Sequence, residues 1–265
     1  MHIHFITRGR LGNAIFRYIA CALMCIKLNG TYVIEQIRYN SIHMNDESFI
    51  KIMENILTNA PIEITSNSIV MMGFFQHDTI FLKHKTQIIN FITNNRDHYI
   101  VTDGITAGDK LCEKFYMHDI VTTPTTFIKK HDIVLHLRLE DFVMHNLFLS
   151  HDRIILLLEK LIFNGEIKNK ICIVCNKLKT DFENEYYNKI KQFLEEKNIN
   201  IILENNDVLT DYYIMRESNT LICSNSTLSW VAALLSDKIT KCYFPDYKNS
   251  SNQTFKCPIE NTELY

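Results

Sequence analysis

The sequence predicts an α/β protein made of two Rossmann-like halves that face each other across a cleft. Three observations carry this prediction. Short apolar runs typical of buried strands alternate with longer amphipathic runs along most of the chain. Asn-Gly pairs follow two of the predicted helices, and clusters of polar residues come directly after several predicted strands. The length of 265 residues is enough for two domains, which we place at 1–125 and 126–265.

The first half begins with a strand, a loop and a helix. A strand is predicted at 3–7 and a helix at 14–27, where apolar residues recur three and four apart and give the helix one apolar face. Asn29-Gly30 is typical of a helix C-terminus, and 32–34 is a second predicted strand. This order indicates a parallel sheet with right-handed crossovers.

The rest of the first half is less regular. Helices are predicted at 47–58 and 81–94, with a strand at 68–75 between them. Residues 95–126 show no clear pattern, and we place the crossover between the halves there.

The second half alternates more clearly between strand and helix patterns. Strands are predicted at 132–138, 170–175, 199–203, 220–223 and 239–244. Helices are predicted at 151–163, 182–197, 208–216 and 228–235.

The composition narrows the class of protein. A net charge of -2 with scattered basic residues argues against a nucleic-acid partner. The chain shows no apolar run of membrane-spanning length and no signal-peptide core, so we expect no transmembrane segment and a cytoplasmic location. The oligomeric state stays open.

Eight cysteines are present, but their spacing does not indicate a metal site. Cys172 and Cys175 alternate along an apolar strand, and Cys21 and Cys25 lie on a helical pattern. A structural zinc site needs four ligands at workable spacing, and none is set out here. We therefore expect buried free thiols and no metal cofactor.

Three segments are candidate ligand sites, and the first lies between a strand and a helix. Gly9 and Gly12 allow positive φ and a close approach of the backbone to a ligand, with Arg10 between them. Asn13 can cap the helix or donate a hydrogen bond to a substrate. Tight-turn packing explains the two glycines equally well.

The second segment is the end of the strand at 132–138. His136, Arg138 and Asp141 place three polar side chains at its carboxyl end, and a guanidinium there can bind two phosphate oxygens. The alternative is an Arg138–Asp141 ion pair that only holds a loop.

The third segment joins the strand at 220–223 to the helix at 228–235. Ser224, Asn225, Ser226 and Thr227 are all good N-cap residues. The unsatisfied N–H groups and partial positive charge of a helix N-terminus bind phosphate readily. A well-capped core helix is the alternative. Taken together, the three segments predict a bound diphosphate.

Several other classes are excluded by missing motifs. The chain has no G-x-x-x-x-G-K-[ST] for a nucleoside triphosphatase and no G-x-G-x-x-G for a dinucleotide enzyme. It has no Asp-x-Asp, which argues against the metal-chelating type of sugar-nucleotide transferase.

Four segments in order resemble motifs of the bacterial-type α-1,2-fucosyltransferase family. Gly9–Tyr18 is similar to its G-G-L-G-N-Q-x-F-Q-Y, and Gly73–Gln76 is similar to its G-Y-F-Q. His136–Phe142 is similar to its H-x-R-R-G-D-Y, and Ser224–Trp230 is similar to its S-N-S-T-F-S-W-W. The resemblance spans nearly the whole chain.

This resemblance implies a GT-B glycosyltransferase that moves L-fucose from GDP-fucose to a glycan hydroxyl, with inversion and without a metal. The first half would bind the acceptor and the second half the nucleotide sugar. Arg138 would neutralise the β-phosphate as the sugar leaves. We assign catalytic roles to Arg138, Asp141 and Asn13. We assign donor binding to Gly9, Arg10, Gly12, His136, Asn176, Ser224, Asn225, Ser226 and Thr227.

The chain departs from the family pattern at several positions. The second arginine of the family motif is Leu139, its glycine is Glu140, and the glutamine after Gly-Asn is Ala14. An acidic pair of the family is replaced by Asn176 and Lys177. Two alternatives therefore stay open, namely another nucleotide-sugar donor and a non-catalytic sugar-nucleotide or glycan-binding protein. The catalytic base stays unassigned, with Asp141, His77 and Asp78 as candidates by residue type.

Overall fold

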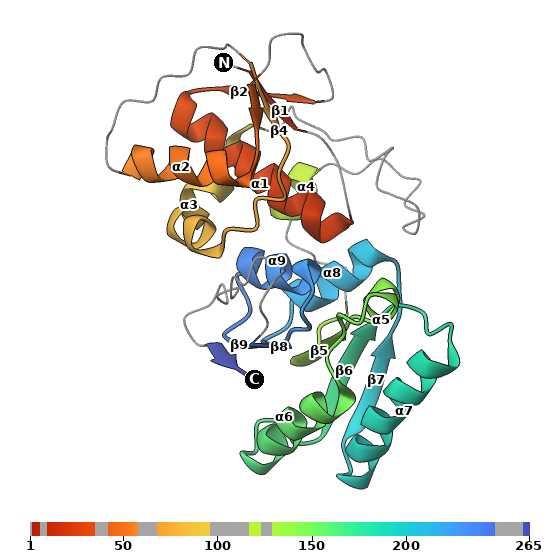
Figure 1. Ribbon diagram of the computed structural model, residues 1–265. Coiled ribbons are helices and arrows are strands. Elements are labelled where there is room, and N and C mark those ends of the chain that lie inside the picture. The colour runs from red at the N-terminus through yellow and green to blue at the C-terminus, as the bar shows by residue number, and fades with distance from the viewer. Residues whose placement is uncertain are drawn as a thin grey trace. The chain divides into compact units, whose positions relative to one another are not determined.

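The computed structural model describes residues 2–5, 10–34, 42–57, 68–95, 117–122, 129–246 and 262–265. The chain divides into two compact units, unit 1 (Met1–Pro124) and unit 2 (Thr125–Tyr265). Each unit is built on its own parallel sheet flanked by helices (Figure 1). The predicted α/β class with two Rossmann-like halves is thereby confirmed.

Unit 1 contains a four-stranded sheet in the order β2-β1-β4-β3, with every pair parallel. Its strands are β1 (His2–Phe5), β2 (Thr31–Ile34), β3 (Ile42–Met44) and β4 (Ser68–Met71). Its described helices are α1 (Leu11–Leu28), α2 (Asp46–Leu57), α3 (Asp78–Asn94) and α4 (Met117–Thr122). Strand β3 was not predicted, because two of its three residues are exposed and no apolar run marks it.

Helix α1 is the central helix of unit 1 and is buried on almost every side. All its residues from Leu11 to Cys25 except Asn13 are buried, so the expectation of a single apolar face was wrong. Phe16 packs against Phe81 of α3, with ring centroids 5.8 Å apart. The helix ends as predicted, at Asn29 in the left-handed conformation (φ 48).

Helix α1 is also the one described helix that is long and apolar enough to cross a membrane by length and composition. The expectation that no run reaches that length was therefore wrong. Within the protein, 78% of the apolar window is buried. The helix packs on β1 and α3, as a core helix does.

Unit 2 contains a six-stranded parallel sheet, and its predicted elements lie within two residues of the observed ones. The strands are β5 (Ile133–Leu137), β6 (Lys170–Cys175), β7 (Asn200–Glu204), β8 (Thr220–Ile222), β9 (Lys241–Phe244) and β10 (Thr262–Leu264). The helices are α5 (Asp141–Met144), α6 (His151–Phe163), α7 (Asp181–Glu196), α8 (Val208–Arg216) and α9 (Thr227–Leu235). The short elements α5 and β10 were not predicted.

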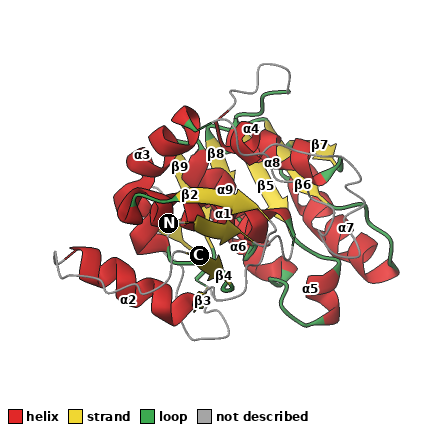
Figure 2. Cartoon of the chain, turned by 90° about the horizontal axis from the view of Figure 1, so that it is seen from above, coloured by secondary structure: helices red, strands yellow, loops and turns green. Residues whose placement is uncertain are grey.

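The strand order of unit 2 is β7-β6-β5-β8-β9-β10 when read from the β7 edge. Numbered along the chain, this is 3-2-1-4-5-6, the order of doubly wound dinucleotide-binding domains. Helices α6 and α7 pack together, as do α8 and α9. The strands β9, β8, β5, β6 and β7 can be followed in this order in Figure 2. The winding reverses between β5 and β8, which is the topological switch point of the sheet.

Six cysteines lie in the described part of the chain, and all six are buried free thiols. Burial raises the pKa of Cys172 and of Cys175 to about 12, which keeps both thiols protonated. Cys112 and Cys257 lie outside the described residues.

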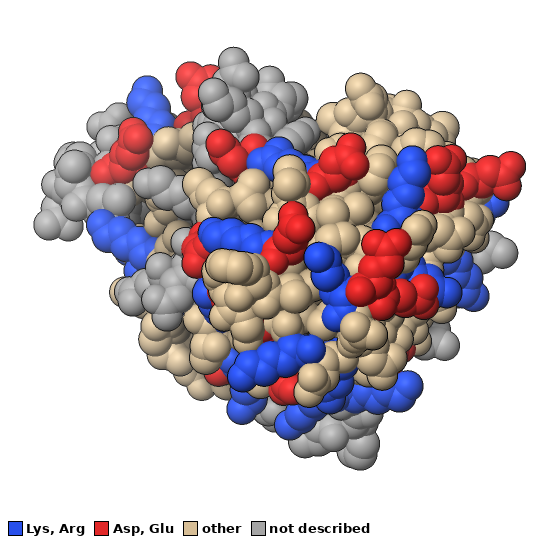
Figure 3. Space-filling model, turned by 90° about the horizontal axis from the view of Figure 1, so that it is seen from below, with Lys and Arg blue, Asp and Glu red and all other residues tan. Residues whose placement is uncertain are grey.

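On the face of the molecule seen in Figure 3, acidic and basic side chains are interspersed.

Candidate functional site

Two of the three predicted segments come together at the switch point of unit 2. Strands β5 and β8 are parallel neighbours, with Leu135 paired to Ile222. Arg138 follows β5, and the 224–227 segment follows β8, so both lie at the same edge of the sheet. In doubly wound sheets, ligands bind just outside the carboxyl ends of the strands at this point. The strand order therefore supports a ligand site at this point independently of the residue types found there.

Arg138 is held by two carboxylates at the end of β5. Its Nη2 donates to Oδ1 of Asp141 at 2.9 Å, and its Nη1 lies 3.8 Å from Oε2 of Glu140. The guanidinium lies over the Phe142 ring, 5.5 Å from the centroid. The side chain is only 11% exposed, and its buried Nε has no hydrogen-bond partner among the described residues. The Arg138–Asp141 ion pair is thus real, and it occupies Nη2 while Nε has no hydrogen-bond partner among the described residues.

The turn after β8 caps helix α9, as predicted. Oγ of Ser226 accepts a hydrogen bond from the Leu228 N–H at 3.2 Å. Oγ of Ser229 donates to the Ser226 and Ser224 carbonyls at 3.0 and 3.3 Å, which fixes the turn from inside the helix. Thr227 is the first residue of the helix. The positive end of α9 is therefore rigidly placed beside the end of β5.

His136 joins the two strand ends. Its Nδ1 lies 2.9 Å from Oγ of Ser224, within hydrogen-bond distance. Burial lowers the pKa of His136 to about 4, so the ring is neutral at physiological pH. A neutral buried ring is unsuited to bind phosphate as a cation, and its role here is to hold the Ser224 turn.

Two asparagines near this edge carry unsatisfied oxygens. Asn225 donates from Nδ2 to the Leu147 carbonyl, and its Oδ1 is buried without a partner in the described structure. Asn176, which follows β6, donates from Nδ2 to the Lys177 carbonyl at 3.2 Å. Its Oδ1 is likewise buried and unpaired within the described ranges. Buried polar atoms are usually hydrogen-bonded, so each of these two oxygens can accept a hydrogen bond that the described residues do not supply.

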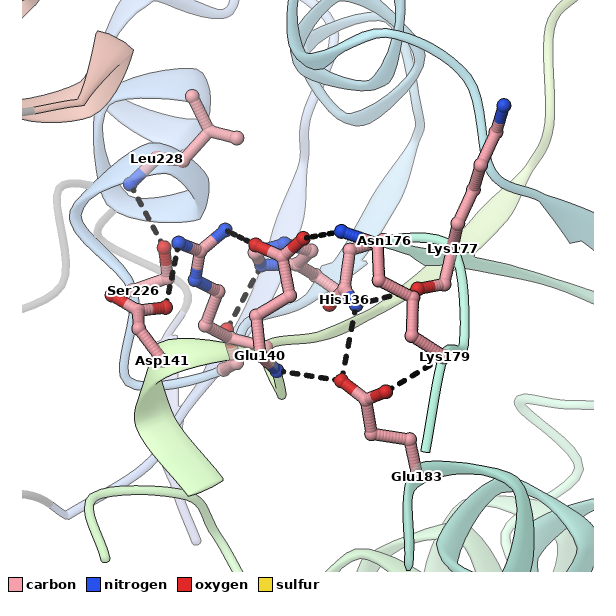
Figure 4. Close-up of polar contacts among 11 residues, drawn as sticks. His136, Glu140, Asp141, Asn176, Lys177, Lys179, Glu183, Ser226 and Leu228 are labelled. Carbon is pink, nitrogen blue, oxygen red and sulfur yellow. Dashed lines mark hydrogen bonds and ion pairs between the residues drawn. The ribbon is translucent and has the colours of Figure 1, made fainter. Parts of the chain in front are cut away.

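Glu183 organises the loops of this edge, and the sequence analysis missed it. Its carboxylate, which is 3% exposed as a residue, accepts from the N–H groups of Glu140 (3.0 Å), Lys179 (2.7 Å) and Thr180 (2.9 Å). Figure 4 shows the bonds from Glu140 and Lys179 meeting at this carboxylate. Burial acts to raise the pKa of Glu183, but these hydrogen bonds outweigh it and hold the pKa below its usual value. The signal was available in the sequence, because Thr180 and Glu183 form a capping box at the start of α7.

The backbone of Glu140 adopts an unusual conformation, with φ 38 and ψ −116. This region favours glycine, because a Cβ atom crowds the backbone there. Glu140 stands where the resembling family has a glycine. Its side chain lies between Arg138 and Lys179, whose Nζ is 3.5 Å from Oε1.

The first predicted segment lies in unit 1 and differs from expectation. Gly9 falls outside the described residues. Helix α1 begins at Leu11, so Gly12 is helical rather than a positive-φ turn residue. Asn13 is not the N-cap either, since Arg10 holds that position without a side-chain cap bond. The correction follows from burial, because the hydrophobic contacts of Leu11 favour an extra helical turn over a loop.

The strand ends of unit 1 are linked through the Gly73–Gln76 segment. Oδ1 of Asn13 accepts from Nε2 of Gln76 at 3.0 Å. The carboxylate of Asp46 accepts from the N–H groups of Phe74 and Phe75 at 3.0 and 2.6 Å. A Cβ on Gly73 would lie 2.2 Å from Oδ2 of Asp46, so this contact requires glycine.

His77 belongs to the same cluster, with its Nε2 3.4 Å from Oδ1 of Asp46. The side chain of Asp78 lies outside the description. Within the described ranges, no group of three or more His, Cys, Asp and Glu side chains could hold a metal ion.

No family model and no curated protein sequence matches the chain. Several solved structures are similar to it at low identity. The α-1,6-fucosyltransferase NodZ soaked with GDP-fucose is 11% identical, with a TM-score of 0.44, over 89% of this chain and 92% of that chain. NodZ from Bradyrhizobium gives a TM-score of 0.43 with the same identity and coverage. The E. coli heptosyltransferase WaaC with ADP is 11% identical, with a TM-score of 0.42, over 100% of this chain and 92% of that chain.

Proposed function

We propose that this chain is a glycosyltransferase that uses a nucleotide sugar, with GDP-fucose as the donor and a glycan hydroxyl as the acceptor. The observation that carries the proposal is the placement of Arg138 and the Ser226-capped end of α9 on adjacent strands at the switch point of unit 2. A guanidinium and a helix N-terminus at one edge of such a sheet are suited to a diphosphate.

Arg138 and the N-terminus of α9 can stabilise the charge that develops during sugar transfer. As the glycosidic bond to the sugar breaks, negative charge develops on the diphosphate leaving group. The guanidinium of Arg138 and the helix amides are already oriented, and the side chain is 11% exposed, so little water screens the interaction. Asp141 positions the guanidinium through the 2.9 Å bond to Nη2. Transfer with inversion and without a metal is what the resemblance to the α-1,2-fucosyltransferase family implies for this site.

The nucleoside would lie against the neighbouring strand ends. In doubly wound domains, a side chain at the end of the second strand accepts a hydrogen bond from a ribose hydroxyl. Strand β6 holds that position here, and Asn176 follows it with an unpaired buried Oδ1. We assign Asn176 to the ribose and the unpaired Oδ1 of Asn225 to a second polar group of the donor.

The choice of GDP-fucose rests on the resemblance of four segments to the α-1,2-fucosyltransferase family, which also suggests the linkage. Unit 2 would bind the donor, and unit 1, with Asn13 at the start of α1, would bind the acceptor. Leu139 and Glu140 replace an arginine and a glycine of that family, which keeps another donor open. Calorimetric titration with GDP, ADP and UDP separates these donors. Tighter binding of ADP or UDP than of GDP would exclude GDP-fucose.

The decisive experiment is the replacement of Arg138. Arg138→Ala is expected to lower kcat for sugar transfer by roughly 10² to 10³, as for the loss of one main donor to a developing anion. Lys189→Ala is the matched control, since Lys189 is an exposed cation paired with Glu185 on α7. Unchanged turnover of Arg138→Ala would refute the proposed role. Tight GDP binding with no turnover of any donor would favour the non-catalytic binding protein.

A further inference from the structure

Glu140 places a carboxylate where an anionic ligand would meet its cation. Its Oε2 lies 3.8 Å from Nη1 of Arg138, and its Oε1 lies 3.5 Å from Nζ of Lys179. The side chain is 24% exposed, whereas that of Lys179 is 68% exposed. The carboxylate thus has one partner inside the site and another toward solvent.

The backbone fixes this carboxylate in place. Glu140 is held at φ 38, a conformation that a non-glycine residue adopts only when its surroundings impose it. The restraint is visible, because the buried carboxylate of Glu183 accepts the Glu140 N–H at 3.0 Å. The same carboxylate accepts from the Lys179 N–H at 2.7 Å, so the backbones of Glu140 and of its partner Lys179 are both held by Glu183.

Asp141 has a different relation to the guanidinium. It bonds Nη2 at 2.9 Å with normal hydrogen-bond geometry, and it begins helix α5. Glu140 lies beyond hydrogen-bond distance from Nη1, so its interaction is a looser ion pair. The looser partner is the one that a phosphate oxygen can displace.

We propose that Glu140 is a built-in competitor of the anionic ligand, which lowers the affinity of the Arg138 site in proportion to the ligand's negative charge. A bound phosphate takes over Nη1 of Arg138, and the Glu140 carboxylate retains Lys179 as its partner. This inference rests on the proposed function, since it concerns the same anion site. It assigns Glu140 a role in setting both the affinity for the donor and the ease with which the nucleoside diphosphate leaves.

The test compares binding of GDP, GMP and guanosine to the full chain by calorimetry. Glu140→Gln removes the charge and keeps the shape. We expect GDP to bind about three- to tenfold more tightly, GMP to gain less, and guanosine to be unchanged. The gain should shrink in 0.5 M salt, because the interaction is electrostatic. Two variants are the controls. Glu140→Asp keeps the negative charge at position 140, and Glu185→Gln removes a carboxylate on α7 that is 67% exposed, so neither should gain affinity for GDP.

The outcomes separate this inference from the proposed function. If GDP binds the unaltered protein and Arg138→Ala weakens it, but Glu140→Gln binds GDP no more tightly, the competitor role is wrong and the function stands. An equal gain for guanosine would show a steric effect and would also overturn it. If no nucleotide binds either protein, the proposed donor site itself fails.

Discussion

The strained backbone of Glu140 allows a prediction of stability that needs no ligand. A non-glycine residue held at φ 38 and ψ −116 costs of order 1–3 kcal/mol. Replacement by glycine removes this strain but adds about 0.5–1 kcal/mol of unfolded-state entropy. Replacement by alanine keeps the strain. Both substitutions lose the same ion pairs with Arg138 and Lys179, so those contacts cancel in the comparison.

Glu140→Gly is therefore expected to be more stable than Glu140→Ala by about 1 kcal/mol, the middle of the range of about 0–2.5 kcal/mol that the two effects give. The assay is urea unfolding followed by the fluorescence of Trp230, the one tryptophan of the chain. Trp230 is 1% exposed and lies on α9, so its signal reports the unfolding of unit 2.

The matched control is the same pair of substitutions at Glu185, an exposed residue in the interior of α7. Glycine there should be less stable than alanine by about 1 kcal/mol, because a regular helix disfavours glycine. The opposite sign at the two positions is the signature of positive φ at Glu140. Alanine equal to or better than glycine at position 140 would refute the reasoning.

Two further predictions concern stability, one at Gly73 in unit 1 and one at Asp211 in unit 2. Gly73→Ala should destabilise unit 1 by about 1–3 kcal/mol, because the new Cβ would lie 2.2 Å from Oδ2 of Asp46 and 2.9 Å from its backbone nitrogen. A thermal melt checks this, and an unchanged Tm would show that the contact is not rigid. Burial raises the pKa of Asp211 from 3.8 to about 7 against the hydrogen bonds from Asn206, so the folded state holds this proton more tightly than the unfolded state. The associated stability is present below about pH 4 and is lost as pH rises through about 7. Between pH 5 and pH 8, the free energy of unfolding of Asp211→Asn should therefore fall by on the order of 2 kcal/mol less than that of the unaltered protein. Urea unfolding of both proteins at the two pH values measures this difference, and an equal fall in both would contradict the prediction.

The regular elements of unit 2 could be predicted because their signals are local. Helices α6 and α8 and strand β6 have the predicted bounds, since apolar periodicity and capping residues lie within each segment. The N-cap at Ser226 could be predicted for the same reason, because its residue type and its neighbours in the sequence indicate it. Where burial overrode local chemistry, prediction failed, as at the start of α1, where Leu11 is fully buried and the helix absorbs Gly12 and Asn13.

Part of the candidate site could also be predicted from local signals in the sequence. Arg138 and the 224–227 segment follow strands, and a parallel sheet gathers all such ends at one edge. The conformation of Glu140 and the convergence of two loops on Glu183 had no signal beyond a capping box. Both depend on backbone groups whose partners lie elsewhere in the chain.

The sequence by itself determined most of the longer strands and helices and the residue types that could bind a phosphate, because periodicity and side-chain chemistry are local properties of each segment. Only the tertiary structure decided that β5 lies beside β8, and hence that Arg138 and the N-terminus of α9 share the switch point. Strand order is set by the packing of residues far apart along the chain. Only that packing fixes which strand ends become neighbours.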